Sequence, residues 1–163
     1  MRNVAMLAGL LGLMAVMSAG AVAQDADQRA IDKEELQRLY TDYLGKEGYN
    51  WEIDDDGDVR FKREGKVYFI QVSDKDPEFF TIVLPNIWPI ENEKERMQVL
   101  VAADASNAKS KVSKVYTMGD NVWVSIELFV EKPERFKGVF KRALSALDNG
   151  VANFAFKMRE LRE

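Results

Sequence analysis

The sequence contains no cysteine and no histidine in its 163 residues. The first absence excludes thiol nucleophiles, disulfides and zinc sites built from cysteine and histidine. The second excludes histidine as a general acid or base, and with it the Ser-His-Asp type of catalytic machinery. A chain without cysteine is also compatible with an oxidising compartment, where a free thiol would mispair. We therefore expect a protein without catalytic residues, metal or cofactor.

A surplus of basic residues is lacking as well. The chain has 23 basic and 27 acidic residues, a net charge of −4, and the two signs alternate along most of its length. Binding to a phosphate backbone usually requires a basic surplus on some element, so we expect no nucleic-acid partner. The length favours one domain, because two would each have to bury a core from fewer than about 80 residues.

An apolar run lies near the amino terminus. Residues 4–17, VAMLAGLLGLMAVM, follow Arg2 and precede the small-residue pattern Ala21-Val22-Ala23. This layout predicts a secretory signal peptide cleaved between Ala23 and Gln24, with an uncleaved anchor as the alternative. The run is shorter than the ~20 apolar residues that cross a bilayer. We expect a signal peptide (1–23), a short leader (24–31) and a folded domain (32–163), which is periplasmic or secreted and has no stable membrane span after cleavage.

Capping signals precede two predicted helices. Asp32 and Glu35 form a capping box before an amphipathic segment that Gly45 and Gly48 end. Asn92 and Glu95 form a second box. The apolar series of this second helix is Met97, Leu100, Val101, Ala105 and Ala108.

A third helix is predicted to begin near Pro133. Its apolar positions recur at alternating threes and fours from Phe136 to Leu161, and the phase survives Asn149-Gly150. One continuous helix is therefore expected, and two helices are the alternative.

Alternating apolar residues predict strands in two runs. The first run has about four strands, near 49–53, 59–62, 67–72 and 79–84, and Pro85 and Pro89 are expected to end the last. The second run is a hairpin, 111–118 and 121–130, joined at Gly119-Asp120. Short links within each run predict an antiparallel sheet packed with three helices, in the order α-ββββ-α-ββ-α, which is an α+β fold.

The turns and core positions resemble a known family. The segment YNWEIDDDGDVRFKREGKVYFIQVSDKDPEFFTIVLPNI, the helix and strand through VLVAADASNAKSKVSKVY, and the hairpin ending VSIELFV are similar to the YbjN family. That family, also named for a proposed role in bacterial sensory transduction, shares the fold of type III secretion chaperones. The resemblance spans about 32–160 and implies a chaperone-like binding domain that forms homodimers. It implies the fold and not the client, because type III secretion chaperones act in the cytoplasm, whereas the predicted signal peptide would export this chain.

Two segments are candidate partner-binding sites. The connector with Trp88 and Ile90 is rich in apolar residues and could form a docking patch, or could seal the second helix onto the sheet. The end of the last helix is a candidate seam for a partner or for the core. Its four candidate residues are Val151, Phe154, Met158 and Leu161.

Two motifs suggest chemistry that the rest of the sequence does not support. The acidic run 54–58 has the oxygen ligands that calcium prefers, but Gly65 stands at the twelfth position where a calcium loop needs a carboxylate. A hairpin turn is the expected structure. Ser106 and Lys109 match S-x-x-K without the companion motifs of penicillin-recognising enzymes, so a solvated helix end is expected.

The leading functional hypothesis is an interaction module that binds a protein or peptide client through a sheet edge, a helix seam or both. A small-ligand carrier is one alternative, in which aromatic residues of the sheet surround a hollow. These residues are Trp51, Phe61, Tyr68, Phe80 and Trp123. A carboxylate-based hydrolase is the other alternative, and it would require two carboxyl groups with opposed environments in one pocket.

Overall fold

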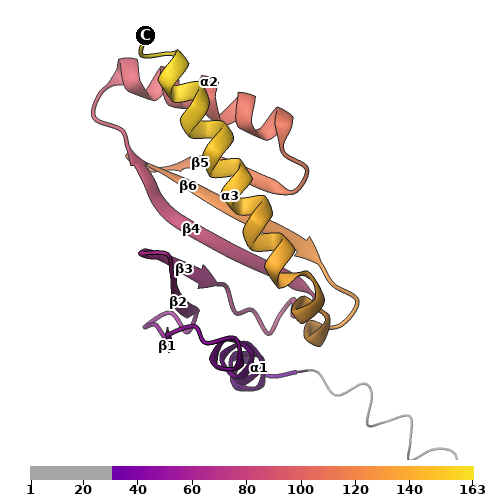
Figure 1. The fold of residues 1–163 in the computed structure, drawn as a ribbon. Helices are drawn as coiled ribbons and strands as arrows, with labels where there is room; N and C mark the ends of the chain where they lie inside the picture. The colour runs from indigo at the N-terminus through magenta and orange to yellow at the C-terminus, as the bar shows by residue number, and fades with distance from the viewer. Residues whose placement is uncertain (1–30) are drawn as a thin grey trace, which may run out of the picture. The chain divides into compact units, whose positions relative to one another are not determined.

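Residues 31–163 are described by a computed structural model, which shows three α-helices and six strands in the predicted order (Figure 1). The predicted signal peptide and all but the last residue of the leader lie outside the described residues. Within the described part, no helix is long and apolar enough to span a membrane. The predicted α+β class is confirmed.

The six strands form one antiparallel sheet in the order β1-β2-β3-β4-β6-β5. Its strands are β1 (Trp51–Ile53), β2 (Val59–Arg63), β3 (Lys66–Ile70), β4 (Phe79–Pro89), β5 (Ser113–Met118) and β6 (Asn121–Phe129). The hairpin of β5 and β6 joins the meander through β4. As predicted, Val122, Val124 and Ile126 share one face, and all three are fully buried.

The expected end of β4 at Pro85 is wrong. β4 pairs regularly with β6 as far as Leu84 and Val124, and pairing resumes at Trp88 and Val122. Three residues of β4, 85–87, therefore stand opposite one residue of β6. This bulge takes Pro85 out of the hydrogen-bonded pairing between β4 and β6. Proline has no backbone N–H to donate, so its place in the bulge avoids a missing hydrogen bond in the sheet.

Local capping begins both of the first two helices. α1 (Lys33–Lys46) starts at Asp32, whose carboxylate accepts a 2.8 Å hydrogen bond from the Glu35 N–H. α2 (Glu93–Lys109) starts at Asn92, whose side chain accepts a 2.9 Å bond from the Glu95 N–H. Both starts are confirmed, because each side chain satisfies a backbone donor that the helix itself leaves free.

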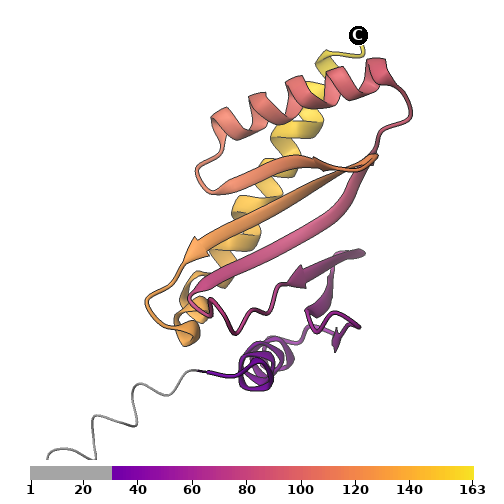
Figure 2. The same ribbon diagram turned by 180° about the vertical axis from the view of Figure 1, so that it is seen from behind.

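α3 (Phe136–Glu160) is one continuous helix, preceded by a short 3-10 turn, Pro133–Arg135. It crosses one face of the sheet, and the view from behind shows the opposite face of β4, β5 and β6 without a helix over it (Figures 1 and 2). Gly150 is buried within it and faces Ser113 of β5. The predicted single helix is confirmed.

Aromatic side chains fill the core where α1, α3 and the sheet meet. Tyr40 contacts Phe136 edge to face, with ring centroids 4.9 Å apart, and Phe61 stacks on Tyr68 at 5.3 Å. All four side chains are at most 1% exposed. The faces of α1, α3 and the sheet are therefore joined by packed rings.

Candidate protein-binding surface

α2 has two apolar faces, and the structure buries the one with the smaller residues. After Glu95 in the first turn, the buried residues are Val99, Ala102, Ala103 and Ser106. Small side chains let the backbone of α2 come close to α3 and β5, which both contact it. The apolar series seen in the sequence is therefore not the core face of this helix.

The opposite side of α2 points away from the core. Met97 is 61% exposed, and Leu100 and Val101 are each 46% exposed. Asp104 and Ala108 are exposed at the same side of the helix, one and two turns further on. We call these five residues the α2 outer face. It is a row of apolar side chains in solvent with one carboxylate in its middle.

An aromatic side chain of α3 lies beside the end of α2. Phe156 is 49% exposed, and the Lys109 ammonium lies 5.8 Å from the centre of its ring. Lys109 belongs to the last turn of α2, so the end of α2 and this part of α3 meet through a cation and a ring.

The outer edge of the sheet at β5 is covered by a side chain. The Asn107 amide donates to the Val115 carbonyl at 3.0 Å and accepts from the Val115 N–H at 2.8 Å. Both backbone groups of Val115 that a partner strand would need are thus occupied by α2. Side chains that cover an edge in this way oppose strand addition, so β5 is a poor site for the predicted sheet-edge contact.

The uncovered sheet face is a mixed polar and aromatic surface. Trp123 lies across from Tyr116, and its indole N–H donates to the side-chain amide oxygen (Oδ1) of Asn86 at 3.1 Å. Asn86 has a φ of 55° in the β4 bulge, a left-handed conformation that Asn tolerates better than most residues. Ser125 donates to the Glu127 carboxylate, which also pairs with Lys114. Only Phe129, 82% exposed, is fully open among the aromatic residues described.

The six candidate residues from the sequence lie at the packing of α2 and α3 against the sheet. Ile90, Phe154 and Met158 are buried in the core, and Val151 and Leu161 pack against it. These side chains therefore face the core of this chain and do not form an open seam. The structure favours the sealing and core-packing alternatives.

Trp88 is the sixth candidate, and it is half-buried. Its ring lies edge to face on Phe154, and its indole N–H donates to the Glu95 carboxylate at 3.0 Å. The Arg162 guanidinium lies over the ring, 4.5 Å from its centre. Sequence reasoning missed Glu95 and Arg162 as a pair, because 67 residues separate them.

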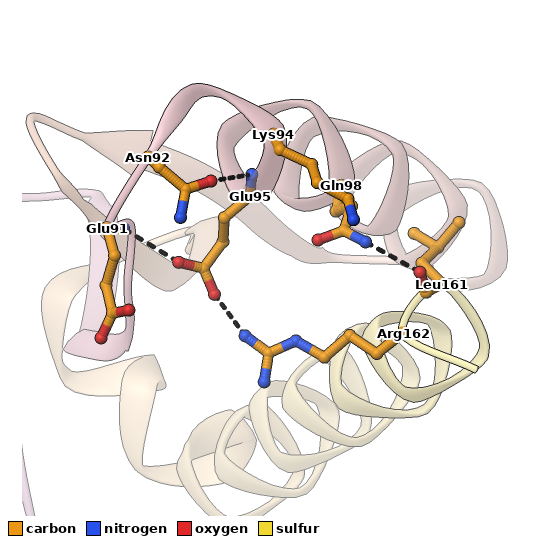
Figure 3. A pocket seen from close by; sticks show the side chains of 7 residues that line it. All are labelled: Glu91, Asn92, Lys94, Glu95, Gln98, Leu161 and Arg162. Atoms are coloured by element: carbon orange, nitrogen blue, oxygen red, sulfur yellow. Dashed lines mark hydrogen bonds and ion pairs between the residues drawn. The ribbon is translucent and has the colours of Figure 1, made fainter.

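Glu95 is the most completely bonded carboxylate of this region (Figure 3). It accepts from the Glu91 N–H at 2.9 Å and from Arg162, both drawn in the figure. It also accepts from the Trp88 indole N–H. The hydrogen bond from the Glu91 backbone is the largest cause that lowers the pKa of Glu95, followed by that from Trp88, while burial opposes them. The carboxylate is therefore held in its charged form.

The acidic run is the expected hairpin turn. The Asp54 carboxylate accepts from the N–H groups of Asp56 and Asp58, and the Asp58 carboxylate accepts from the Val72 N–H at 2.8 Å. No group of three or more acidic side chains within residues 31–163 is arranged to hold a metal ion. These oxygens fix the backbone of the turn.

Ser106 is not at a solvated helix end, which corrects that prediction. It is fully buried, and its hydroxyl donates to the Gly150 carbonyl at 2.9 Å. The hydroxyl joins α2 to α3 and has no access to a substrate.

The aromatic residues of the proposed ligand carrier do not surround one hollow. Phe61, Tyr68 and Phe80 are packed in the core, Trp51 is 45% exposed, and Trp123 lies on the other face of the sheet. This arrangement gives the ligand-carrier alternative no support.

Comparison with known proteins adds evidence on the fold. No protein-family model and no curated protein matches the sequence. Among solved structures, the crystal structure of YbjN from E. coli, a candidate transcription regulator, is similar with 13% sequence identity and a TM-score of 0.53. That match covers 69% of this chain and 85% of YbjN. The predicted resemblance to YbjN is confirmed as a likeness of fold.

A second solved structure is the HopA1-SchA chaperone-effector complex. One of its chains matches with 12% identity and a TM-score of 0.49, and the match covers 76% of this chain and 97% of that chain.

Proposed function

We propose that this chain is a non-catalytic protein-binding module, that it works outside the cytoplasm, and that it contacts its partner through the α2 outer face. The observation that carries the proposal is the row of exposed apolar side chains on α2, led by Met97, Leu100 and Val101. Single exposed apolar residues are common on proteins, whereas contiguous rows of them mark interaction surfaces.

The chemistry of the α2 outer face suggests the chemistry of the partner. Asp104 lies among its apolar residues, with Met97 and Val101 on preceding turns. A partner that places apolar side chains around one basic residue would bury the apolar area and pair the carboxylate. A single polar group in such an interface fixes the register of the two surfaces.

The non-catalytic part of the proposal is supported by how the shifted carboxylates are used. Burial is the largest cause that raises the pKa of Asp58, and backbone hydrogen bonding is the largest cause that lowers that of Glu95. The pKa of Glu127 is also lowered: burial, the largest cause, opposes the shift, and the bonds from Lys114 and Ser125 produce it. The three groups belong to separate hydrogen-bond clusters without a shared residue. A carboxylate hydrolase needs two such groups converging on one substrate.

The export part of the proposal is supported by the sequence of residues 1–23. A positive residue, a run of about 14 apolar residues and a small-residue cleavage pattern are the three parts of a secretory signal.

The binding proposal is tested by affinity purification from an extracytoplasmic extract with matched variants of residues 24–163. Leu100→Glu places a charge on the α2 outer face, and Ile53→Glu places the same charge at an equally exposed position on β1. We expect a discrete protein partner with the unchanged chain and with Ile53→Glu, and its loss with Leu100→Glu.

Light scattering on the same samples separates a second copy of the chain from a different protein, and thermal unfolding shows that both variants are folded. A partner retained by Leu100→Glu, or a monomer that captures nothing in any form, would contradict the proposal.

A further inference from the structure

The start of α2 and the end of the chain enclose a pocket of about 230 Å³ (Figure 3). Glu95 and Gln98 line it from α2, and Leu161 and Arg162 line it from the residues after α3. The Gln98 amide donates to the Leu161 carbonyl at 2.8 Å. The pocket shares no residue with the α2 outer face.

The anionic wall of the pocket is held without help from Arg162. Glu95 is only 7% exposed, and it accepts from the Trp88 indole and from the Glu91 N–H. Both donors come from the segment that precedes α2. They fix the carboxylate in one orientation, so the anionic side of the site is preorganised for a cation.

The cation that lines the pocket is the side chain of Arg162, which follows α3. The Arg162 guanidinium pairs with the Glu95 carboxylate and lies 4.5 Å from the centre of the Trp88 ring. Its side chain is 50% exposed, whereas that of Glu95 is 9% exposed. The carboxylate thus belongs to the interior, and the cation reaches it from the solvent side.

The geometry suits a guanidinium better than an ammonium ion. A planar guanidinium can lie on an aromatic face while its edge donates to a carboxylate. A buried carboxylate without a cation is strongly unfavourable, so the site favours a bound cation whichever chain supplies it.

We propose that Trp88 and Glu95 form a guanidinium-binding site that Arg162 fills as an intramolecular ligand, and that an arginine side chain of a partner protein binds there when Arg162 leaves. The end of the chain then acts as a plug for the site. This inference does not rest on the proposed function of the α2 outer face, because it is tested with a small probe and needs no captured protein.

The test is a titration of the full chain with N-acetylarginine amide, followed by NMR on the Trp88 indole N–H. The chain has three tryptophans, and Trp88→Phe identifies the resonance. In Arg162→Ala we expect a saturable shift with an apparent affinity at least about tenfold higher than in the unchanged chain, because an intramolecular ligand competes at millimolar effective concentration. N-acetyllysine amide should bind the variant more weakly.

Arg159→Ala is the matched control, since it removes an exposed arginine from the same end of α3 and leaves Arg162 in place on Trp88 and Glu95. It should titrate like the unchanged chain. Arg162→Lys keeps the positive charge and should show an intermediate affinity, which keeps the test valid if Arg162→Ala does not fold. The inference is overturned if no variant shows a saturable shift, if Arg162→Ala and the unchanged chain bind equally, or if the lysine probe binds as well as the arginine probe.

Discussion

Gly150 lets the last helix lie directly against the edge of the sheet. A Cβ atom added at this position would stand 2.6 Å from the Ser113 hydroxyl oxygen and 2.9 Å from its Cβ. Real Cβ atoms do not approach other atoms so closely. Rotation of the Ser113 hydroxyl can relieve the first contact but not the second, because the Ser113 Cβ is bonded directly to the backbone of β5. The glycine is thus a contact residue in the middle of a helix, where it would otherwise be unfavourable.

Overpacking in Gly150→Ala should lower the free energy of unfolding by roughly 1–3 kcal/mol. The higher helix propensity of Ala offsets ~1 kcal/mol of this loss. Gly138→Ala is the matched control on the same helix, because nothing lies within 4 Å of its added Cβ. It should stabilise the protein. Urea unfolding measures both, and a smaller loss for Gly150→Ala in a Ser113→Gly background would assign the effect to this contact. An unchanged loss there would contradict the assignment.

Glu95 should make stability depend on pH in acid. Its folded-state pKa lies below its usual value, with the Glu91 backbone bond as the largest cause. Its contribution is therefore complete above the unfolded pKa of about 4.3 and is lost as pH falls through the lower folded value. Glu95→Gln should lower the urea midpoint clearly at pH 7 and much less at pH 3. Glu93→Gln, on the exposed side of the same turn, should change it little at either pH. An equal loss from Glu95→Gln at both pH values would contradict this.

At the scale of elements, the two faces of α2 differ in burial. The face with Val99 and Ala102 is buried, and the α2 outer face is exposed and is the proposed partner-binding surface. The two valines of this helix make the division measurable, since Val99 is fully buried and Val101 is 46% exposed.

Val99→Ala should lower the free energy of unfolding by about 1–3 kcal/mol, because it leaves a cavity in the core. The same substitution at Val101 should change it by less than ~0.5 kcal/mol. Chemical denaturation of the two variants is sufficient. Equal effects would mean that the outer face is not free in the isolated chain.

The starts and order of the elements could be predicted because their signals are local. Asp32 and Asn92 cap helices through bonds that span three residues, and the heptad phase of α3 is visible through Gly150. The core face of α2 could not be predicted, because both of its sides are apolar and contacts with α3 decide between them. Continuation of β4 past Pro85 depends on its pairing with β6, which is also a distant contact.

The candidate site was predicted only in part for the same reason. Trp88 was singled out in an apolar connector, as part of a docking patch or of a seal between the second helix and the sheet, and in the structure its ring contacts the Arg162 guanidinium. Its partners Glu95 and Arg162 are ordinary charged residues in sequence, and only the fold brings Arg162 back to the start of α2. Phe154 and Met158 have the spacing of a seam, but both are already buried within this chain.

At the scale of the whole molecule, the proposal requires a mature chain outside the cytoplasm. Protein isolated from the extracytoplasmic fraction should begin at Gln24, which mass spectrometry of the intact chain measures. An Ala23→Leu variant should be processed poorly, because signal cleavage needs small residues at this site. A chain that keeps Met1 or stays in the cytoplasm would contradict export.

The most direct measurement of the central proposal is photocrosslinking from the α2 outer face in cells that make the protein. A photoreactive residue at Leu100 should give a crosslinked product of one defined mass, whereas the same residue at Ile53, equally exposed on β1, should not. Crosslinking at neither position, or equally at both, would contradict a binding role for this face.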